Sequence, residues 1–264
     1  MIAYYNENDK NAAAWLRELI KEKLIAPGEV DERSIEDVLP TELVGYRQCH
    51  FFAGIGGWSY ALRLAGWPDN KPIWTASCPC QPFSQAGQGK GAADERHLWP
   101  PTKWLIDQLR PPKIFGEQVA SKDGRQWFAG VRIDLETMGY ASGAADLCAA
   151  SIGAPHIRQR LYWVGDSSGS GLQKRISYNG IQREAGQSQP GQASKLSSGS
   201  GRNGWGDNWI DCADGKTRRI EPGISPLAHG IPNRVELIRG YGNAIVPQVA
   251  AKFIEVCEEL GRFP

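Results

Sequence analysis

The sequence predicts an α/β protein built on a doubly wound sheet, with one smaller insert. Short apolar segments rich in β-branched and aromatic residues alternate with segments whose apolar residues recur at helical spacing. This alternation is typical of a sheet whose strands are linked by helices. The 264 residues are enough for one large domain, or for one domain with a small appendage.

The first 67 residues predict three strands and two helices. Residues 1–5 (MIAYY) predict a short strand, 26–30 (APGEV) permit a second, and 49–57 (CHFFAGIGG) predict a third that runs into a glycine turn. A helix capped by Asp9 is expected from apolar residues at helical spacing, which are Ala12, Trp15, Leu16, Leu19, Ile20 and Leu24. Residues 58–67 (WSYALRLAGW) follow as a helix that ends at Gly66.

Four strands and three helices are expected further along the chain. The strands are 72–78 (PIWTASC), 112–119 (PKIFGEQV), 140–150 (YASGAADLCAA) and 160–166 (RLYWVGD). Helical patterns lie around Trp104–Leu109 and Phe128–Met138. The chain closes with an amphipathic helix with Pro247 in its first turn. Its apolar face consists of Val246, Ala250, Phe253, Ile254 and Cys257.

Composition changes after Asp166, where the chain becomes rich in Gly, Ser and Gln and poor in aliphatic residues. Such a segment buries little core, so it is either a flexible linker or a recognition surface built from loops. Within it, residues 209–223 (WIDCADGKTRRIEPG) predict a hairpin around Asp214-Gly215. Its return arm carries Lys216, Arg218 and Arg219. We therefore expect a discontinuous α/β domain with a small insert.

Charge and cysteine use restrict the class of protein. The 30 Lys and Arg and 29 Asp and Glu leave a formal net charge of +1, which neither requires nor excludes nucleic acid. The sequence has no apolar run of the length that a membrane span requires, and its start lacks the pattern of a signal peptide. Six cysteines without a secretory signal indicate reduced thiols. We therefore expect a soluble intracellular protein.

The stretch ASCPCQPFSQAG (76–87) places Cys78 and Cys80 one residue apart. This spacing is too tight for the usual zinc pair, the four histidines are scattered, and a disulfide across one residue is strained. A cysteine at a strand end before a Pro/Ser/Gly loop suits a thiolate held in a cleft. A structural thiol in a turn is the alternative.

Other residues with chemical potential each have a structural alternative. The turn at 54–57 (GIGG) lets a cofactor approach the backbone, or only packs the next helix on the sheet. Glu117 ends an apolar strand, where burial suits a proton donor, or it is a capping carboxylate. Arg158 and Arg160 share one face at the start of a strand, where they hold phosphate or a base edge, or form an ordinary surface pair. Asn243 lies in a glycine-flanked turn before the last helix.

In their order and spacing, five of these segments resemble motifs of the DNA (cytosine-5)-methyltransferase family. They are 52–57 (FAGIGG) for its first cofactor motif, 79–87 (PCQPFSQAG) for its catalytic loop, 117–119 (EQV) for its Glu-Asn-Val motif, 156–160 (HIRQR) for its Gln-x-Arg-x-Arg motif, and 242–247 (GNAIVP) for its last motif. The resemblance runs from His50 to about Val164 and from about Arg239 to the end. It implies a Rossmann-like sheet that binds S-adenosylmethionine, with a small target-recognition insert.

The resemblance implies a role for each motif residue. Cys80 would attack C6 of a cytosine flipped out of duplex DNA, so that C5 can take the methyl group of S-adenosylmethionine. Glu117 would engage the N3/N4 edge of the base and protonate N3. Arg160 would contact the base carbonyl, and Arg158 would hold the loop or a phosphate. The implied cofactor contacts are Phe52, Gly54, Gly56, Gly57, Leu98 and Asn243.

The first two motifs lie closer together than in the family. Only 28 positions separate Phe52 from Cys80, without room for the two strands whose acidic residues bind the cofactor ribose and adenine. Residues 1–48 resemble those strands, so we expect a permuted order along the chain: second, third, first, fourth strand. Glu7 would then bind the ribose hydroxyls and Asp31 the adenine amino group. The alternative is that this segment forms an unrelated cap.

The expected organisation is a catalytic domain over 1–165, a target-recognition region over 166–238, and the last motif with the C-terminal helix over 239–264. Basic residues available for phosphate or base contacts are Lys174, Arg175, Arg183, Lys216, Arg218 and Arg219, and the catalytic loop adds Gln81 and Ser84 for contacts to DNA. The expected partner is double-stranded DNA, bound by a monomer without a metal.

Three positions depart from the family pattern. Gln118 replaces the usual Asn, His156 the usual Gln, and His50 a usual Asp. None of the three removes a group that the mechanism needs, although Gln118 is expected to change how the catalytic loop is braced.

The sequence therefore predicts a prokaryotic or phage-type methyltransferase, as in restriction-modification, in the cytoplasm of a bacterial or phage-infected cell. Alternatives are the same fold acting on RNA cytosine, a variant cofactor, or a degenerate module that only binds DNA. Retention of Cys80, Glu117, Arg160 and Asn243 argues against the last, because binding alone needs no nucleophile.

Overall fold

A seven-stranded sheet forms the centre of the protein, in the order β2-β1-β3-β4-β5-β7-β6. The computed structural model describes residues 2–79, 98–154, 156–167, 209–211, 217–219 and 244–261. The strands are β1 (Ala3–Asn6), β2 (Gly28–Asp31), β3 (Gln48–Phe51), β4 (Ile73–Ala76), β5 (Lys113–Val119), β6 (Ala141–Cys148) and β7 (Gln159–Asp166). All seven predicted strands of the sheet are therefore present.

Six strands run in the same direction, and β7 lies antiparallel to both of its neighbours, β5 and β6. The two N-terminal strands extend this sheet beside β3. The residues before β3 therefore are not a separate cap. The neighbour order also agrees with the permuted arrangement, because β3 still lies directly beside β4.

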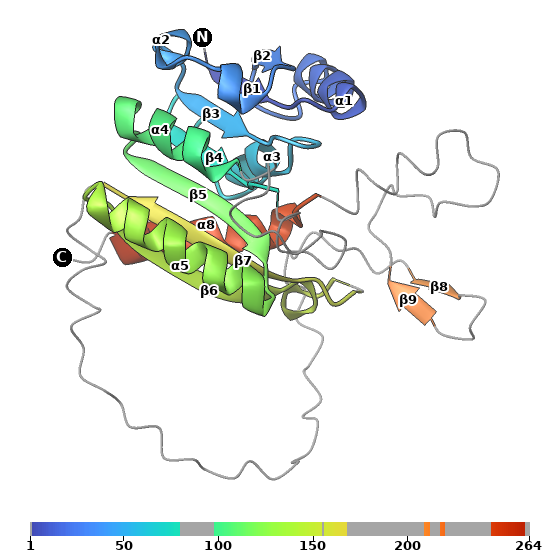
Figure 1. Cartoon of the computed structure of the whole chain (residues 1–264). Helices are drawn as coiled ribbons and strands as arrows, with labels where there is room; N and C mark the ends of the chain where they lie inside the picture. The colour runs from blue at the N-terminus through green and yellow to red at the C-terminus, as the bar shows by residue number, and fades with distance from the viewer. Residues whose placement is uncertain are drawn as a thin grey trace, which may run out of the picture.

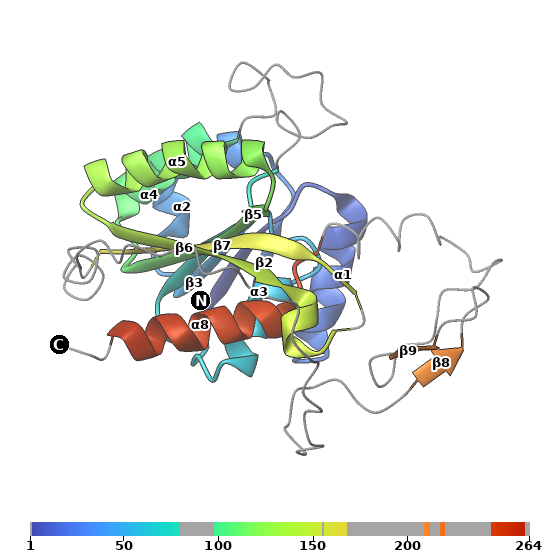
Figure 2. The ribbon, with the colours of Figure 1, turned by 90° about the horizontal axis from the view of Figure 1, so that it is seen from below.

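Helices cover both faces of the sheet, as Figure 2 shows edge-on. One face carries α2 (Pro40–Leu43), α4 (Trp99–Leu109) and α5 (Lys122–Thr137), and the other carries α1 (Lys10–Lys21), α3 (Gly57–Leu64) and α8 (Pro247–Gly261). Two short 3-10 helices, η1 (Ile35–Asp37) and η4 (Ala149–Ile152), complete this part of the chain. The predicted doubly wound α/β class is confirmed (Figure 1).

Each face has its own hydrophobic core. The core under α4 and α5 contains buried aromatic residues from several elements, among them Phe51, Trp74, Trp99, Trp127 and Trp163. The core under α3 and α8 is built around Trp58, Phe115, Tyr162 and Phe253. Two stacked layers of this kind are the usual way in which an α/β sheet buries both of its faces.

The first helix confirms its predicted cap but not its full apolar stripe. The Asp9 carboxylate accepts hydrogen bonds from the backbone N–H groups of Asn11 and Ala12. Leu16 is fully buried, whereas Trp15 and Leu24 are 43% and 50% exposed. The helix packs at the edge of the sheet, beside the four-residue strand β2, so only a narrow side of it is covered.

Two helices begin earlier than the apolar pattern predicts. The fourth helix, α4, begins at Trp99 rather than Trp104, and α5 begins at Lys122 rather than near Phe128. The first turn of α5 is polar and lacks apolar periodicity, but Ser121 caps it by accepting a hydrogen bond from the Gly124 N–H. A cap therefore marks the start of α5, whereas α4 has prolines in its first turn and no side-chain cap.

The predicted hairpin and the predicted C-terminal helix are both confirmed for the residues that the structure describes. The strands β8 (Trp209–Asp211) and β9 (Thr217–Arg219) pair in antiparallel fashion, as expected for a hairpin. Its turn at Asp214-Gly215 lies outside the described residues. Pro247 is the first residue of α8, and Ala250, Phe253 and Ile254 on its apolar side are buried. Among the described residues, no helix is long and apolar enough to cross a membrane.

Candidate active site

Among the described residues, the predicted site residues at the ends of β1, β2 and β5, after β3 and at the start of β7 lie at one edge of the sheet. The carboxyl ends of β2, β1, β3, β4 and β5 meet there because these strands are parallel. The antiparallel strand β7 starts at the same edge, where Arg160 lies opposite Val119, the last residue of β5. In open α/β sheets, ligands bind beyond the carboxyl ends of the strands. This edge is therefore the candidate active site.

The glycine turn after β3 is tight and partly packed. Phe52, Gly54 and Gly56 all have positive φ angles, of 55°, 55° and 81°. A Cβ at Gly56 would come within 3.3 Å of side-chain atoms of α1, and one at Gly57 would lie 2.8 Å from Ile245. No atom of the described residues lies within 4 Å of the Cβ position at Gly54. The absence of a side chain at Gly56 and Gly57 thus allows the turn to pack closely against its neighbours. At Gly54 it leaves space among the described residues at the sheet edge.

Glu7 links the end of β1 to this turn. Its carboxylate accepts hydrogen bonds from the backbone N–H of Gly54 at 2.7 Å and of Asp9 at 2.9 Å, one on each oxygen. Its own N–H donates to the carbonyl of Asp31 at 2.9 Å. A carboxylate has about four acceptor positions, so Glu7 keeps capacity for two more donors, such as a pair of hydroxyls.

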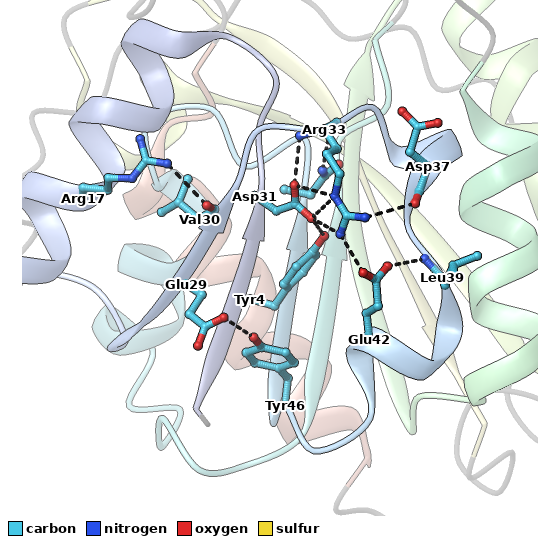
Figure 3. Close-up of polar contacts among 11 residues, drawn as sticks. Tyr4, Arg17, Glu29, Val30, Asp31, Arg33, Asp37, Leu39, Glu42 and Tyr46 are labelled. Atoms are coloured by element: carbon cyan, nitrogen blue, oxygen red, sulfur yellow. Dashed lines mark hydrogen bonds and ion pairs between the residues drawn. The ribbon is translucent and has the colours of Figure 1, made fainter.

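Asp31 ends β2 and lies in a network of polar contacts (Figure 3). It forms an ion pair with Arg33 at 2.7 Å and accepts a hydrogen bond from the Tyr4 hydroxyl at 2.7 Å. Sequence reasoning selected Asp31 but missed Arg33 and Tyr4. The position of Arg33 two residues after the acidic strand end was an available signal. No signal in the sequence pointed to Tyr4, because its contact with Asp31 depends on how β1 and β2 pair.

Glu117 and Arg160 form the central ion pair of the site, with Arg160 Nε 2.8 Å from a Glu117 carboxylate oxygen. The side chain of Glu117 is only 11% exposed. Burial raises the pKa of this carboxyl, although Arg160 and Arg158 act to lower it. Arg158 donates to the carbonyl of Ala244 at 2.7 Å and so joins β7 to the residues before α8. The expected raised pKa of Glu117 is confirmed.

The residues just before Cys80 are held in place from β5. The Gln118 amide donates to the carbonyl of Cys78 at 3.4 Å and accepts from the Val119 N–H at 2.9 Å. The Cys78 thiol is buried beside Thr102, and burial raises its pKa to about 12. A thiol of this kind stays protonated at neutral pH and is a poor nucleophile. This agrees with the choice of Cys80 over Cys78.

Several predicted site residues lie outside the described part of the chain: Cys80, Gln81, Ser84, Asn243 and Lys216, together with the side chains of Arg218 and Arg219. The same holds for Lys174, Arg175 and Arg183. Leu98 precedes α4 and packs against the core on that face. His50 is buried inside β3, and His156 is exposed before β7. In the described ranges, no group of three or more His, Cys, Asp or Glu residues is placed to hold a metal.

Comparison with known proteins places these features in a family. The family model of C-5 cytosine-specific DNA methylases matches residues 67–211. Type II methyltransferase M.NaeI of Lentzea aerocolonigenes is 32% identical over 162 residues, which cover 60% of this chain and 32% of that protein. Type II methyltransferase M.HhaI of Haemophilus parahaemolyticus is 26% identical over 168 residues, 48% of this chain and 51% of that protein. The chain thus spans between a third and a half of these relatives.

Two solved structures are also similar. The Dnmt2 methyltransferase of S. pombe aligns with a TM-score of 0.39 and 14% identity, over 63% of this chain and 51% of that chain. A DNA modification methyltransferase encoded within an E. coli prophage, described as putative, aligns with a TM-score of 0.37 and 13% identity, over 64% and 47% of the two chains.

Proposed function

This chain belongs to the C-5 cytosine-specific DNA methylases, and from that premise we propose that it methylates C5 of cytosine in double-stranded DNA. S-adenosylmethionine would supply the methyl group as an electrophile. The target base would be flipped out of the duplex, which costs a few kcal/mol of stacking and pairing. The protein would act as a monomer in the cytoplasm of a bacterial or phage-infected cell, in the manner of a modification enzyme.

The buried Glu117–Arg160 pair is the observation that carries this proposal. A carboxyl with a raised pKa keeps its proton to higher pH than an ordinary glutamate, and it lies 2.8 Å from a cation that can bind a carbonyl. Glu117 would donate its proton to N3 of cytosine, while Arg160 would bind the base carbonyl. Protonation at N3 draws electrons from the ring and makes C6 electrophilic.

Cys80 would supply the nucleophile, because it follows β4 by four residues and therefore belongs to the segment that leaves the same sheet edge. Its thiolate would add to C6, which makes C5 nucleophilic towards the methyl group. Loss of the C5 proton and release of the thiolate would then restore the double bond between C5 and C6. Gln118 would hold the start of this segment through the Cys78 carbonyl.

The sheet edge fits S-adenosylmethionine. Gly54 leaves open space beside the turn, and the Glu7 carboxylate retains acceptor capacity for ribose hydroxyls. Phe52, Gly56 and Gly57 would shape the turn, and Leu98 and Asn243 would complete the contacts. Gln81, Ser84, Lys216, Arg218 and Arg219 would bind DNA.

A trapping experiment tests the function. The protein is incubated with S-adenosylmethionine and duplexes that contain 5-fluorocytosine in many sequence contexts. Fluorine at C5 blocks the final proton loss, so we expect a covalent adduct detectable by mass. Cys80→Ser should abolish the adduct, and Glu117→Gln should slow its formation at least about 100-fold, as expected for a lost general acid. Cys148→Ser, at the end of β6, is the matched control and should keep the adduct.

Three outcomes would contradict the proposal. An adduct that survives Cys80→Ser would exclude this nucleophile. DNA binding without any adduct would favour a module that only binds DNA, and an adduct with structured RNA alone would change the substrate.

A further inference from the structure

The acidic residue at the end of β2 has no acceptor capacity left for a cofactor. We propose that Asp31 and Arg33 act together as positioning residues that shape the turn after β2, and that Asp31 does not itself accept a hydrogen bond from the adenine amino group. This inference rests on the proposed function, because it concerns how the same site binds S-adenosylmethionine. It departs from the role that the sequence resemblance implies for Asp31.

Both oxygens of Asp31 are fully engaged (Figure 3). One accepts from the backbone N–H of Arg33 at 2.9 Å, and the Arg33 Nε–H is shared between the two oxygens at 3.1 and 3.0 Å. The other accepts from the Tyr4 hydroxyl at 2.7 Å and from Arg33 Nη2 at 2.7 Å. Four donors occupy the roughly four acceptor positions that a carboxylate has. An adenine amino group would therefore have to displace one of them.

Such a displacement is unfavourable. The guanidinium donates charge-assisted hydrogen bonds in a planar fork, which are about twice as strong as bonds from a neutral donor. The amino group of adenine is a neutral donor. Burial acts to raise the pKa of Asp31, but hydrogen bonds from Arg33 and Tyr4 outweigh it and lower the pKa, so the carboxylate stays charged and paired.

Arg33 also holds the residues that follow β2. Its Nη2 pairs with Glu42 at 3.0 Å, and the second oxygen of Glu42 accepts from the Leu39 N–H at 2.8 Å. The Arg33 carbonyl accepts from the Asn6 amide at 2.9 Å, one residue before Glu7. The guanidinium thus connects the end of β2 to η1, through the Asp37 carbonyl at 3.4 Å, and to α2. The backbone carbonyl of Arg33 makes the connection to β1. Its loss would loosen the turn next to the cofactor-binding edge.

Equilibrium binding of two ligands tests the proposal. S-adenosylhomocysteine carries the 6-amino group, and S-inosylhomocysteine carries an oxygen there. We expect Arg33→Ala and Asp31→Asn each to weaken S-adenosylhomocysteine binding about tenfold, the loss typical of one charge-assisted contact. The double variant should bind no more weakly than the weaker single variant, because the two residues act as one unit. Any preference of the wild type between the two ligands should survive in every variant.

Control variants separate positioning from general damage. Arg17→Ala removes a pair with Glu32 beside the same strand end and should leave binding unchanged. Arg33→Lys keeps the charge but not the fork, so it should restore only part of the affinity. Thermal unfolding of each variant reports whether it is folded. If Asp31→Asn fails to fold, Arg33→Ala and Arg33→Lys with both ligands still carry the test.

Two results would overturn the inference. If Asp31→Asn loses the ligand preference while Arg33→Ala keeps it, Asp31 contacts the adenine directly. If Arg33→Ala binds S-adenosylhomocysteine as tightly as the wild type does, Arg33 has no positioning role. Failure of the wild type to bind either ligand would instead contradict the proposed function itself.

Discussion

Two carboxylates at the sheet edge have opposite electrostatic environments. Burial raises the pKa of Glu117 despite its pairing with Arg160, whereas hydrogen bonds from Arg33 and Tyr4 lower the pKa of Asp31 against the effect of burial. Carboxyl groups whose surroundings separate their pKa values in this way can take different roles at one pH. Glu117 suits a proton donor, and Asp31 suits a permanent anion that organises its neighbours.

A single buried histidine should control the acid sensitivity of the fold. His50 bonds to Thr75 and Gln48, and burial lowers its pKa to about 3. In the unfolded chain a histidine has a pKa of about 6.5. The unfolded state therefore binds more protons between these values, and the free energy of unfolding falls as pH drops below 6.5.

We expect His50→Gln to make this fall shallower, by up to about 1.4 kcal/mol per pH unit. Urea unfolding at pH 7, 6 and 5 measures it. Thr75→Val is the control, since it removes a partner of the ring but keeps the titrating group. It should lower stability at every pH without changing the slope. Parallel pH profiles for His50→Gln and the wild type would disprove the prediction.

At the scale of an element, β5 depends on one glycine. A Cβ at Gly116 would lie 2.1 Å from the ring of Trp163 and 2.5 Å from the carbonyl oxygen of Ala76. Trp163 is fully buried in β7, so the ring has no space into which it can move. The residue after this glycine is Glu117, and the close approach of the two strands therefore helps to set its position.

Gly116→Ala should lower the free energy of unfolding by at least about 1–3 kcal/mol, because overpacking forces strands apart. Urea unfolding measures the change. Gly130→Ala is the matched control in α5, where nothing lies within 4 Å of the new Cβ. It should be neutral or raise stability by about 0.5–1 kcal/mol, since Gly disfavours helix. Equal effects of the two substitutions would contradict this account of β5.

At the scale of the whole molecule, α8 joins the end of the chain to the sheet. Glu258 pairs with Lys71 at 2.5 Å and with Lys113 at 2.7 Å, and Lys113 also pairs with Asp166 at 3.2 Å. These residues come from the segment before β4, from the start of β5, from the end of β7 and from α8. The cluster therefore lies at the edge of the sheet opposite the active site.

Removal of Glu258 should loosen this connection without stopping chemistry. Glu258→Gln should cost about 1–3 kcal/mol of unfolding free energy, because it leaves the partly buried Lys113 with a single counter-charge. Adduct formation with 5-fluorocytosine should continue when the protein is folded. Glu255→Gln, on the exposed side of α8, pairs only at the surface with Lys252 and should change stability by less than about 1 kcal/mol. A loss no larger than that of the control would contradict the structural role of Glu258.

The α/β class, the seven strands of the sheet, the cap at Asp9 and the family could all be predicted from the sequence. Strand and cap signals are local, so they can be read from neighbouring residues. The sequence also identified Glu117 and the arginine pair, because their motif spacing is specific. The starts of α4 and α5 were placed too late. The first turn of α5 is polar and carries no apolar period, and in α4 two prolines follow Trp99 and interrupt the apolar pattern.

The direct contacts between these residues could be found only in the folded structure. The bond between Gly54 and Glu7 joins residues 47 positions apart, and the bond between Tyr4 and Asp31 joins residues 27 apart. Such contacts depend on which strands become neighbours, and no local pattern specifies that order. The same holds for the full engagement of Asp31. An acidic residue at a strand end looks available in a sequence, and only its packed surroundings show that its acceptor positions are already filled.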